Sequence, residues 1–140
     1  ETFADKDLCR LSIMLLKEGL GIIQKADIKL VSLPTFPVER IMGLANMPMD
    51  QAAGIIHQTL TGLSQEPLYG SILQSIMRHR ASEIDYINGE IVRLAGQIKA
   101  QAPLNSLMVD LVHTVEKSGR YFQIKDVKKK FSVEHAGKNA

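Results

Sequence analysis

The sequence predicts an all-α domain, and three observations carry this prediction. Apolar residues recur every three or four positions through most of the chain, which is the period of an amphipathic helix. Prolines and glycines fall between these runs, where helices are expected to begin and end. No stretch alternates between apolar and polar residues in the way a half-buried strand would. We therefore expect a multi-helix domain without a sheet.

The length and composition narrow the class of protein. A chain of 140 residues is the size of one ordinary domain. With 45% hydrophobic residues, 23% charged residues and a net charge of +2, it resembles a soluble globular protein and not a disordered chain. There is no signal-peptide pattern and no apolar run of about 20 residues, so we expect no membrane partner and a cytoplasmic location. The single cysteine, Cys9, lies among apolar residues and is expected to be a buried thiol.

The first half of the chain is expected to contain three helices, over residues 5–26, 38–46 and 51–62. Thr2 and Asp5 are spaced like a capping box at the start of the first helix. The segment around Pro34 should be an irregular connection because two prolines lie close together there. Asp50 is the expected cap of the third helix.

The second half is expected to contain a helix around Ser71, whose end leads through a short basic connection into the next helix, and then two further long helices counted from Ser82 onward. Ser82 and Asp85 resemble a capping box, which places Glu83 in the first turn of a helix. That helix carries an apolar stripe that is either core or interface, formed by Ile84, Ile87, Ile91, Leu94 and Ile98. Pro103 should open a last helix that ends at Ser118 and Gly119, followed by a basic, partly disordered tail.

Most familiar chemical motifs are absent from the sequence. The Gly-Leu-Gly at positions 19–21 lacks the third glycine of a dinucleotide-binding loop, because Gln24 stands there. One cysteine and scattered histidines give no credible metal site. Asp110, His113 and Glu116 spread around one helix and are expected on a solvated face. The run Lys128–Lys130 has no interleaved aromatic residues, so we expect no nucleic-acid partner.

The stretch from Ser71 to Gly89, S-I-L-Q-S-I-M-R-H-R-A-S-E-I-D-Y-I-N-G, resembles a signature of the ketopantoate reductase (2-dehydropantoate 2-reductase) family. The family pattern is similar to S-M-L-Q-D-I, then a basic connection, then T-E-I-D-Y-I-N-G. The similarity continues downstream through Pro103 and Asn105, and upstream through a helix with an inward glutamate, here Glu18. It covers most of residues 3–121, within the C-terminal domain of the family.

This resemblance implies a fold and a function. Family members join a Rossmann domain that holds NADPH to a helical domain that resembles the C-terminal domain of 6-phosphogluconate dehydrogenase. They reduce 2-dehydropantoate to (R)-pantoate, on the route to pantothenate and coenzyme A. Ser71 matches the substrate-binding serine of the motif, and Glu83 matches its catalytic-site carboxylate. The resemblance therefore implies NADP(H) as cofactor, a small 2-oxo acid as substrate, and a Rossmann domain of the same parent chain as partner.

The chain also departs from the family pattern. In the family, the catalytic lysine lies on the first helix of this domain and begins a K-x-x-x-N pattern. Neither Lys6 nor Lys17 begins such a pattern here. We therefore expect residues 1–121 to be the substrate-side domain without its first helix, inactive alone, with residues 122–140 as the basic tail. Ser75 stands where the family has aspartate, and Lys99-Ala100 replaces the usual Gly-Ile.

Two alternatives remain open from the sequence. The chain could be a helical interaction module, in which the stripe from Ile84 to Ile98 is the seam of a homodimer or larger oligomer. It could also belong to a reductase of another 2-oxo acid, because Ser75 removes a charge near the expected site.

Overall fold

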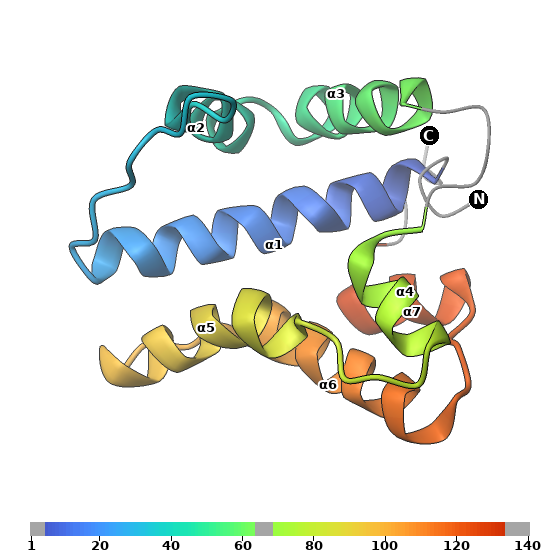
Figure 1. Ribbon diagram of the computed structural model, residues 1–140. Coiled ribbons are helices and arrows are strands. Elements are labelled where there is room, and N and C mark those ends of the chain that lie inside the picture. Colours follow the sequence, from blue (N-terminus) through green and yellow to red (C-terminus); the bar gives the residue numbers. More distant parts are fainter. Residues whose placement is uncertain (1–4, 64–68, 134–140) are drawn as a thin grey trace. The chain divides into compact units, whose positions relative to one another are not determined.

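A computed structural model describes residues 5–63 and 69–133, and the regular secondary structure of this part of the chain consists of helices (Figure 1). The only β-type pairing in these residues is an isolated bridge between Leu33 and Phe36. The helices are α1 (Lys6–Lys25), α2 (Val38–Asn46), α3 (Met49–Gly62), α4 (Ser71–Met77), α5 (Ile84–Gln97), α6 (Pro103–Ser118) and α7 (Ile124–Phe131). None of the helices in these residues is long and apolar enough to span a membrane. The all-α prediction is confirmed.

Several helix ends follow the local sequence signals. The carboxylate of Asp5 accepts hydrogen bonds from the N–H groups of Asp7 at 2.9 Å and Leu8 at 3.3 Å, and it thereby caps α1. At the end of α6, Gly119 adopts a left-handed conformation with φ 67°, and its N–H donates to the Val115 carbonyl at 2.8 Å. A residue without a Cβ adopts this conformation at little cost, so the sequence marks this helix end correctly.

Two predicted caps are wrong. Helix α3 begins at Met49 after Pro48, so Asp50 lies in its first turn instead of capping it. Helix α5 begins at Ile84, and Glu83 occupies its N-cap position without a side-chain capping bond. The capping box expected from Ser82 and Asp85 is not formed, because the Ser82 N–H donates to Glu116 and the Ser82 hydroxyl accepts from the Ile84 N–H instead of that of Asp85. Thr2 lies outside the described residues.

The chain after Phe122 differs from the expected tail, because Ile124–Phe131 form helix α7. Its last residue, Phe131, and the following Val133 are buried. Ser132 ends the helix in a left-handed conformation with φ 54°. The remainder of the expected tail, residues 134–140, lies outside the described residues.

The contacts within the chain define two compact units. Among the described residues, the first unit takes residues 5–16, 30–63 and 123–133, and the second takes residues 17–29 and 69–122. Helix α1 contributes its first half to one unit and its second half to the other.

A charged cluster within the first unit ties α7 to the start of α1. The Lys128 ammonium lies 2.7 Å from the Asp5 carboxylate and 2.9 Å from that of Asp7. Partial burial raises the pKa of Asp5, but hydrogen bonds from Lys128 and from two backbone N–H groups outweigh this and lower it below 3.8. A lowered pKa in the folded state means that the Asp5 contribution to stability is present above the unfolded pKa and is lost as the pH falls through the folded pKa.

We therefore expect the Lys128→Met variant to lose about 1 kcal/mol of unfolding free energy at about pH 6, and less at about pH 3. Urea unfolding of both proteins at the two pH values measures this difference. Lys129→Met is the matched control, because Lys129 is the exposed neighbour on the same helix. An equal loss for Lys128→Met at both pH values would contradict the assigned role of the ion pairs.

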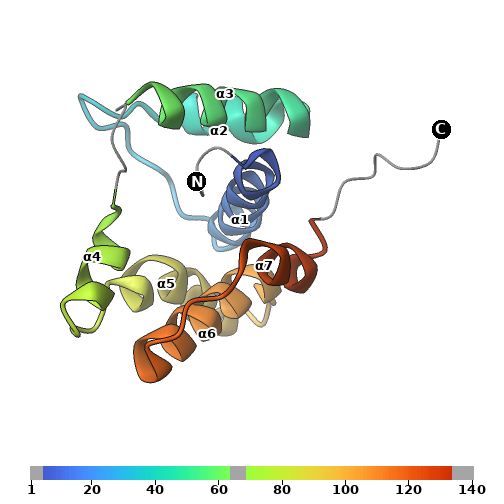
Figure 2. The same ribbon diagram turned by 90° about the vertical axis from the view of Figure 1, so that its right-hand side faces the viewer.

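The second unit is built on the packing of α5 against α6 (Figure 1 and Figure 2). Its buried cluster joins Ile22 of α1, Ala95 of α5 and Ala102 before α6. Partly buried residues that pack on this cluster are Ile91, Val92, Leu94, Ile98 and Ala100. Most of the apolar stripe predicted on α5 is therefore core, whereas Ile87 is 53% exposed.

Candidate functional site

Ser71 is the first residue of α4 and is exposed to solvent. The chain enters this helix through Gly70, which is extended with φ −63° and ψ 159°. Gln74 anchors the entry, because its side-chain amide donates to the Tyr69 carbonyl at 2.8 Å. A hydroxyl at this place is accessible to a small ligand.

Glu83 is half-buried at the N-terminus of α5. Its neighbours Ser82 and Ile84 are both buried, with exposed fractions of 7% and 1%. Its own carbonyl accepts a hydrogen bond from the Tyr86 N–H at 3.0 Å. A carboxylate at this end of a helix is favoured by the unpaired N–H groups and by the helix dipole.

Helix α4 and the short connection after it separate Ser71 from Glu83. Helix α4 closes with hydrogen bonds from the His79 N–H to the Ile76 carbonyl at 2.9 Å and from the Arg80 N–H to the Ser75 carbonyl at 3.0 Å. His79 is left-handed with φ 54°, so the chain turns sharply there. The described residues show no hydrogen bond or ion pair that joins Ser71 directly to Glu83.

Glu116 of α6 holds this connection in place, although no sequence pattern indicates this role. Its carboxylate accepts a hydrogen bond from the Ser82 N–H at 2.8 Å. Hydrogen bonding with Ser82 lowers the pKa of Glu116 below its usual value of 4.5. The expectation of a wholly solvated face is wrong for Glu116, which is half-buried. No local pattern could reveal a pair that lies 34 positions apart.

A second carboxylate, Glu18 of α1, organises the start of α6. It accepts hydrogen bonds from the N–H groups of Leu104 at 2.9 Å and Asn105 at 2.8 Å, and from the Asn105 side-chain amide at 2.7 Å. The Asn105 oxygen in turn accepts from the Asn88 amide of α5 at 2.8 Å. Residues that carried the sequence resemblance, which are far apart in the chain, thus meet in one partly buried network around Asn105.

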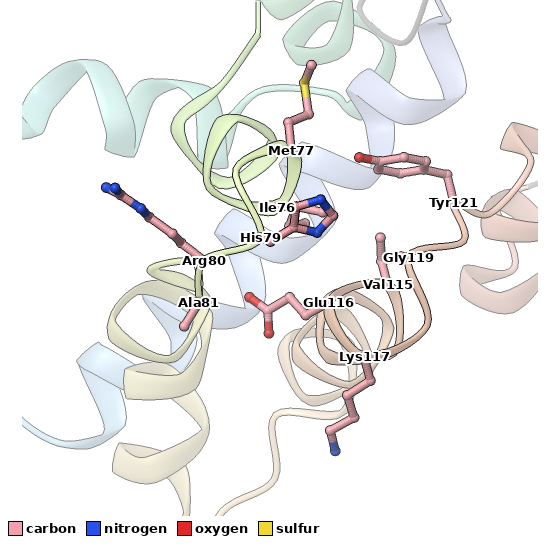
Figure 3. Close-up of a pocket in the computed structure, with 10 residues that line it drawn as sticks. All are labelled: Ile76, Met77, His79, Arg80, Ala81, Val115, Glu116, Lys117, Gly119 and Tyr121. Atoms are coloured by element: carbon pink, nitrogen blue, oxygen red, sulfur yellow. The ribbon is translucent and has the colours of Figure 1, made fainter.

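A pocket of about 580 Å³ lies beside the α4–α5 connection and the end of α6 (Figure 3). The residues that line it are Ile76, Met77, His79, Arg80, Ala81, Val115, Glu116, Lys117, Gly119 and Tyr121. Figure 3 shows that Arg80 and Lys117 extend away from the other lining side chains, whereas Glu116 points toward the backbone at Ala81. Ser71 and Glu83 do not line this pocket.

Neither a metal nor a dinucleotide has an evident place in the described residues. Within residues 5–63 and 69–133, no three His, Cys, Asp or Glu side chains are grouped to share a metal ion. The Gly-Leu-Gly at positions 19–21 lies inside α1, away from any strand-to-helix turn of the kind that binds a pyrophosphate. Cys9 is buried. This burial raises the pKa of its thiol, and the negative charge of Asp5 adds a smaller effect in the same direction.

Comparison with known proteins identifies the family. The family described as "Ketopantoate reductase PanE/ApbA C terminal" matches residues 1–116. The 2-dehydropantoate 2-reductase of Pyrococcus abyssi is 40% identical over 65 residues, which cover 46% of this chain and 20% of that protein. The 2-dehydropantoate 2-reductase of Pyrococcus horikoshii is 45% identical over 51 residues, which cover 36% of this chain and 17% of that protein.

The matched segments thus span about a fifth of the length of these curated relatives. No solved structure matches the chain significantly. The family match nevertheless covers most of the sequence, and the α4–α5 connection and the network around Glu18 lie within it. The chain therefore belongs to the ketopantoate reductase family, whose helical C-terminal domain it contains.

Proposed function

We propose that this chain is the substrate-side domain of an NADPH-dependent reductase that acts on 2-dehydropantoate. The observation that carries the proposal is the family match over residues 1–116, within which Ser71 and Glu83 stand at the motif positions. In the structure Ser71 is the first residue of α4 and Glu83 is the N-cap residue of α5, the next helix along the chain. The substrate would meet this domain at those two helix ends.

Each residue has a distinct task in this proposal. The Ser71 hydroxyl binds an oxygen of the small 2-oxo acid and orients it, which is a modest energetic gain with a large geometric effect. The Glu83 carboxylate is held at the N-terminus of α5, where it positions the substrate and the groups around it. Reduction adds a hydride to the ketone carbon and a proton to its oxygen.

The described residues do not form a dinucleotide-binding unit, so the proposal assigns NADPH to a Rossmann domain of the same parent protein. When bound there, NADPH supplies the hydride. The lysine that the family resemblance implies as proton donor would also come from another part of the parent protein. On this proposal the chain alone is inactive.

The test uses the complete product of the reading frame that encodes these residues, with NADPH oxidation as the readout. We expect Ser71→Ala to raise KM for 2-dehydropantoate about tenfold, and Glu83→Gln to lower kcat/KM about 100-fold. Ser12→Ala and Glu90→Gln are matched controls, because Ser12 and Glu90 are exposed residues of α1 and α5 and lie outside the expected site. Both controls should retain wild-type kinetics.

The same assay decides between substrates. Ser75, which replaces the aspartate of the family pattern, is half-buried on α4 close to Ser71 in sequence. A wild-type enzyme that reduces another small 2-oxo acid with a higher kcat/KM than 2-dehydropantoate would retain the reductase class and change the substrate. Absence of activity with all such acids would refute the proposed function.

A helical interaction module is the second candidate function. The observation in its favour is that Tyr86 and Ile87 on α5 are 79% and 53% exposed. Normal kinetics in both Ser71→Ala and Glu83→Gln, together with a dimer in solution that Ile87→Glu dissociates, would favour this candidate.

A further inference from the structure

The α4–α5 connection depends on a residue that does not belong to it. Ser82 is buried, although it lies in a polar segment between two helices. A buried backbone N–H needs a partner, and here that partner is the carboxylate of Glu116 on α6 at 2.8 Å. A charged acceptor makes this bond stronger than a bond to a neutral carbonyl.

We infer that Glu116 is a positioning residue of the reductase, which fixes the Glu83 carboxylate by holding Ser82. This inference rests on the proposed function and extends it to a residue that the family motif does not include. Glu116 acts through the backbone and does not itself touch the substrate.

The hydrogen bonds on both sides of Glu83 support this role. The Ser82 N–H donates to Glu116 at 2.8 Å and the Ser82 hydroxyl accepts from the Ile84 N–H at 3.4 Å, so Ser82 connects Glu116 to the start of α5. Ile84 is itself fixed, because its side chain is 1% exposed. The residues before and after Glu83 are therefore both held in place. The backbone that carries the Glu83 carboxylate thus has little conformational freedom.

The surroundings of Glu116 favour its charged form. Hydrogen bonding with Ser82 lowers its pKa most; partial burial opposes this effect, and the nearby charges of His113 and Lys117 lower the pKa further. Figure 3 shows its carboxylate turned toward the backbone at Ala81, next to Ser82, while Lys117 extends away. At neutral pH Glu116 is therefore a carboxylate, the form that accepts the hydrogen bond from the Ser82 N–H.

The test is a double-mutant cycle on the complete reading-frame product. We expect Glu116→Ala to lower kcat/KM between about tenfold and 100-fold, because a displacement of an active-site group by about 1 Å has effects of this size. Glu116→Gln should lie between Glu116→Ala and wild type, because its amide oxygen can still accept from one Ser82 donor. Asp110→Ala, which removes an exposed carboxylate from the same helix, is the control and should leave kcat/KM unchanged.

The decisive measurement is the effect of Glu116→Ala in the Glu83→Gln background. If Glu116 acts through Glu83, the second substitution should leave kcat/KM nearly unchanged there, although it still lowers the melting temperature. Additive losses of kcat/KM in an active enzyme would overturn this inference and leave the proposed function intact. A wild-type protein without reductase activity would instead overturn the proposed function, and this inference with it.

Discussion

Replacement of Glu18 by alanine is expected to lower the free energy of unfolding by about 3 kcal/mol. The carboxylate accepts three hydrogen bonds, two from the backbone at the start of α6 and one from the side chain of Asn105. Asn105 is 2% exposed, so water cannot easily replace the lost acceptor. Each buried donor left without a partner costs about 1 to 3 kcal/mol. The loss of an anion at a helix N-terminus adds to this cost.

Urea unfolding followed by circular dichroism measures the effect of Glu18→Ala. Glu18→Gln should destabilise the protein less, because the amide oxygen can still accept from one or two of the donors. Glu90→Ala serves as the control, since Glu90 pairs with Arg93 on the surface of α5, and surface ion pairs contribute little. A Glu18→Ala variant as stable as the Glu90→Ala variant would show that the network at the start of α6 does not support the fold.

The helices of this protein could be predicted wherever their signals are local. Pro103 begins α6 and Gly119 ends it, as expected from the fixed φ of proline and the left-handed conformation open to glycine. Helix α2 has the expected bounds because prolines delimit it on both sides. The start of α1 could be predicted only in part, because Asp5 is itself the capping residue, whereas the expected capping box with Thr2 places Asp5 in the first turn.

Helix α7 is not among the predicted helices, although the sequence of this segment carries a helical signal. Ile124, Val127 and Phe131 recur at i, i+3 and i+7, and all three are at least half-buried. The run of three lysines between them suggested a solvated tail. The ion pairs of Lys128 with Asp5 and Asp7 show why a basic helix is stable here, but the partners lie more than 120 positions away in the sequence.

The candidate site could also be predicted only in part from the sequence. The motif placed Ser71 and Glu83 through its resemblance to a family, and their functional roles remain predictions that kinetics must test. The residue that holds the connection between them, Glu116, could not be found from periodicity, because a carboxylate on a helix face gives no indication of a partner 34 residues earlier. Long-range hydrogen bonds of this kind become visible only once the helices are packed.

The two isoleucines at positions 84 and 87 offer the sharpest test of how α5 is oriented. Ile84→Ala is expected to lower the free energy of unfolding by about 3 kcal/mol, because Ile84 is 1% exposed and its truncation leaves a cavity. Ile87→Ala should cost less than about 1 kcal/mol, because Ile87 is 53% exposed. Urea unfolding of both variants at several protein concentrations measures this difference. Equal losses would contradict the described orientation of the helix, and a loss for Ile87→Ala that grows with protein concentration would show that α5 contacts a second copy of the chain.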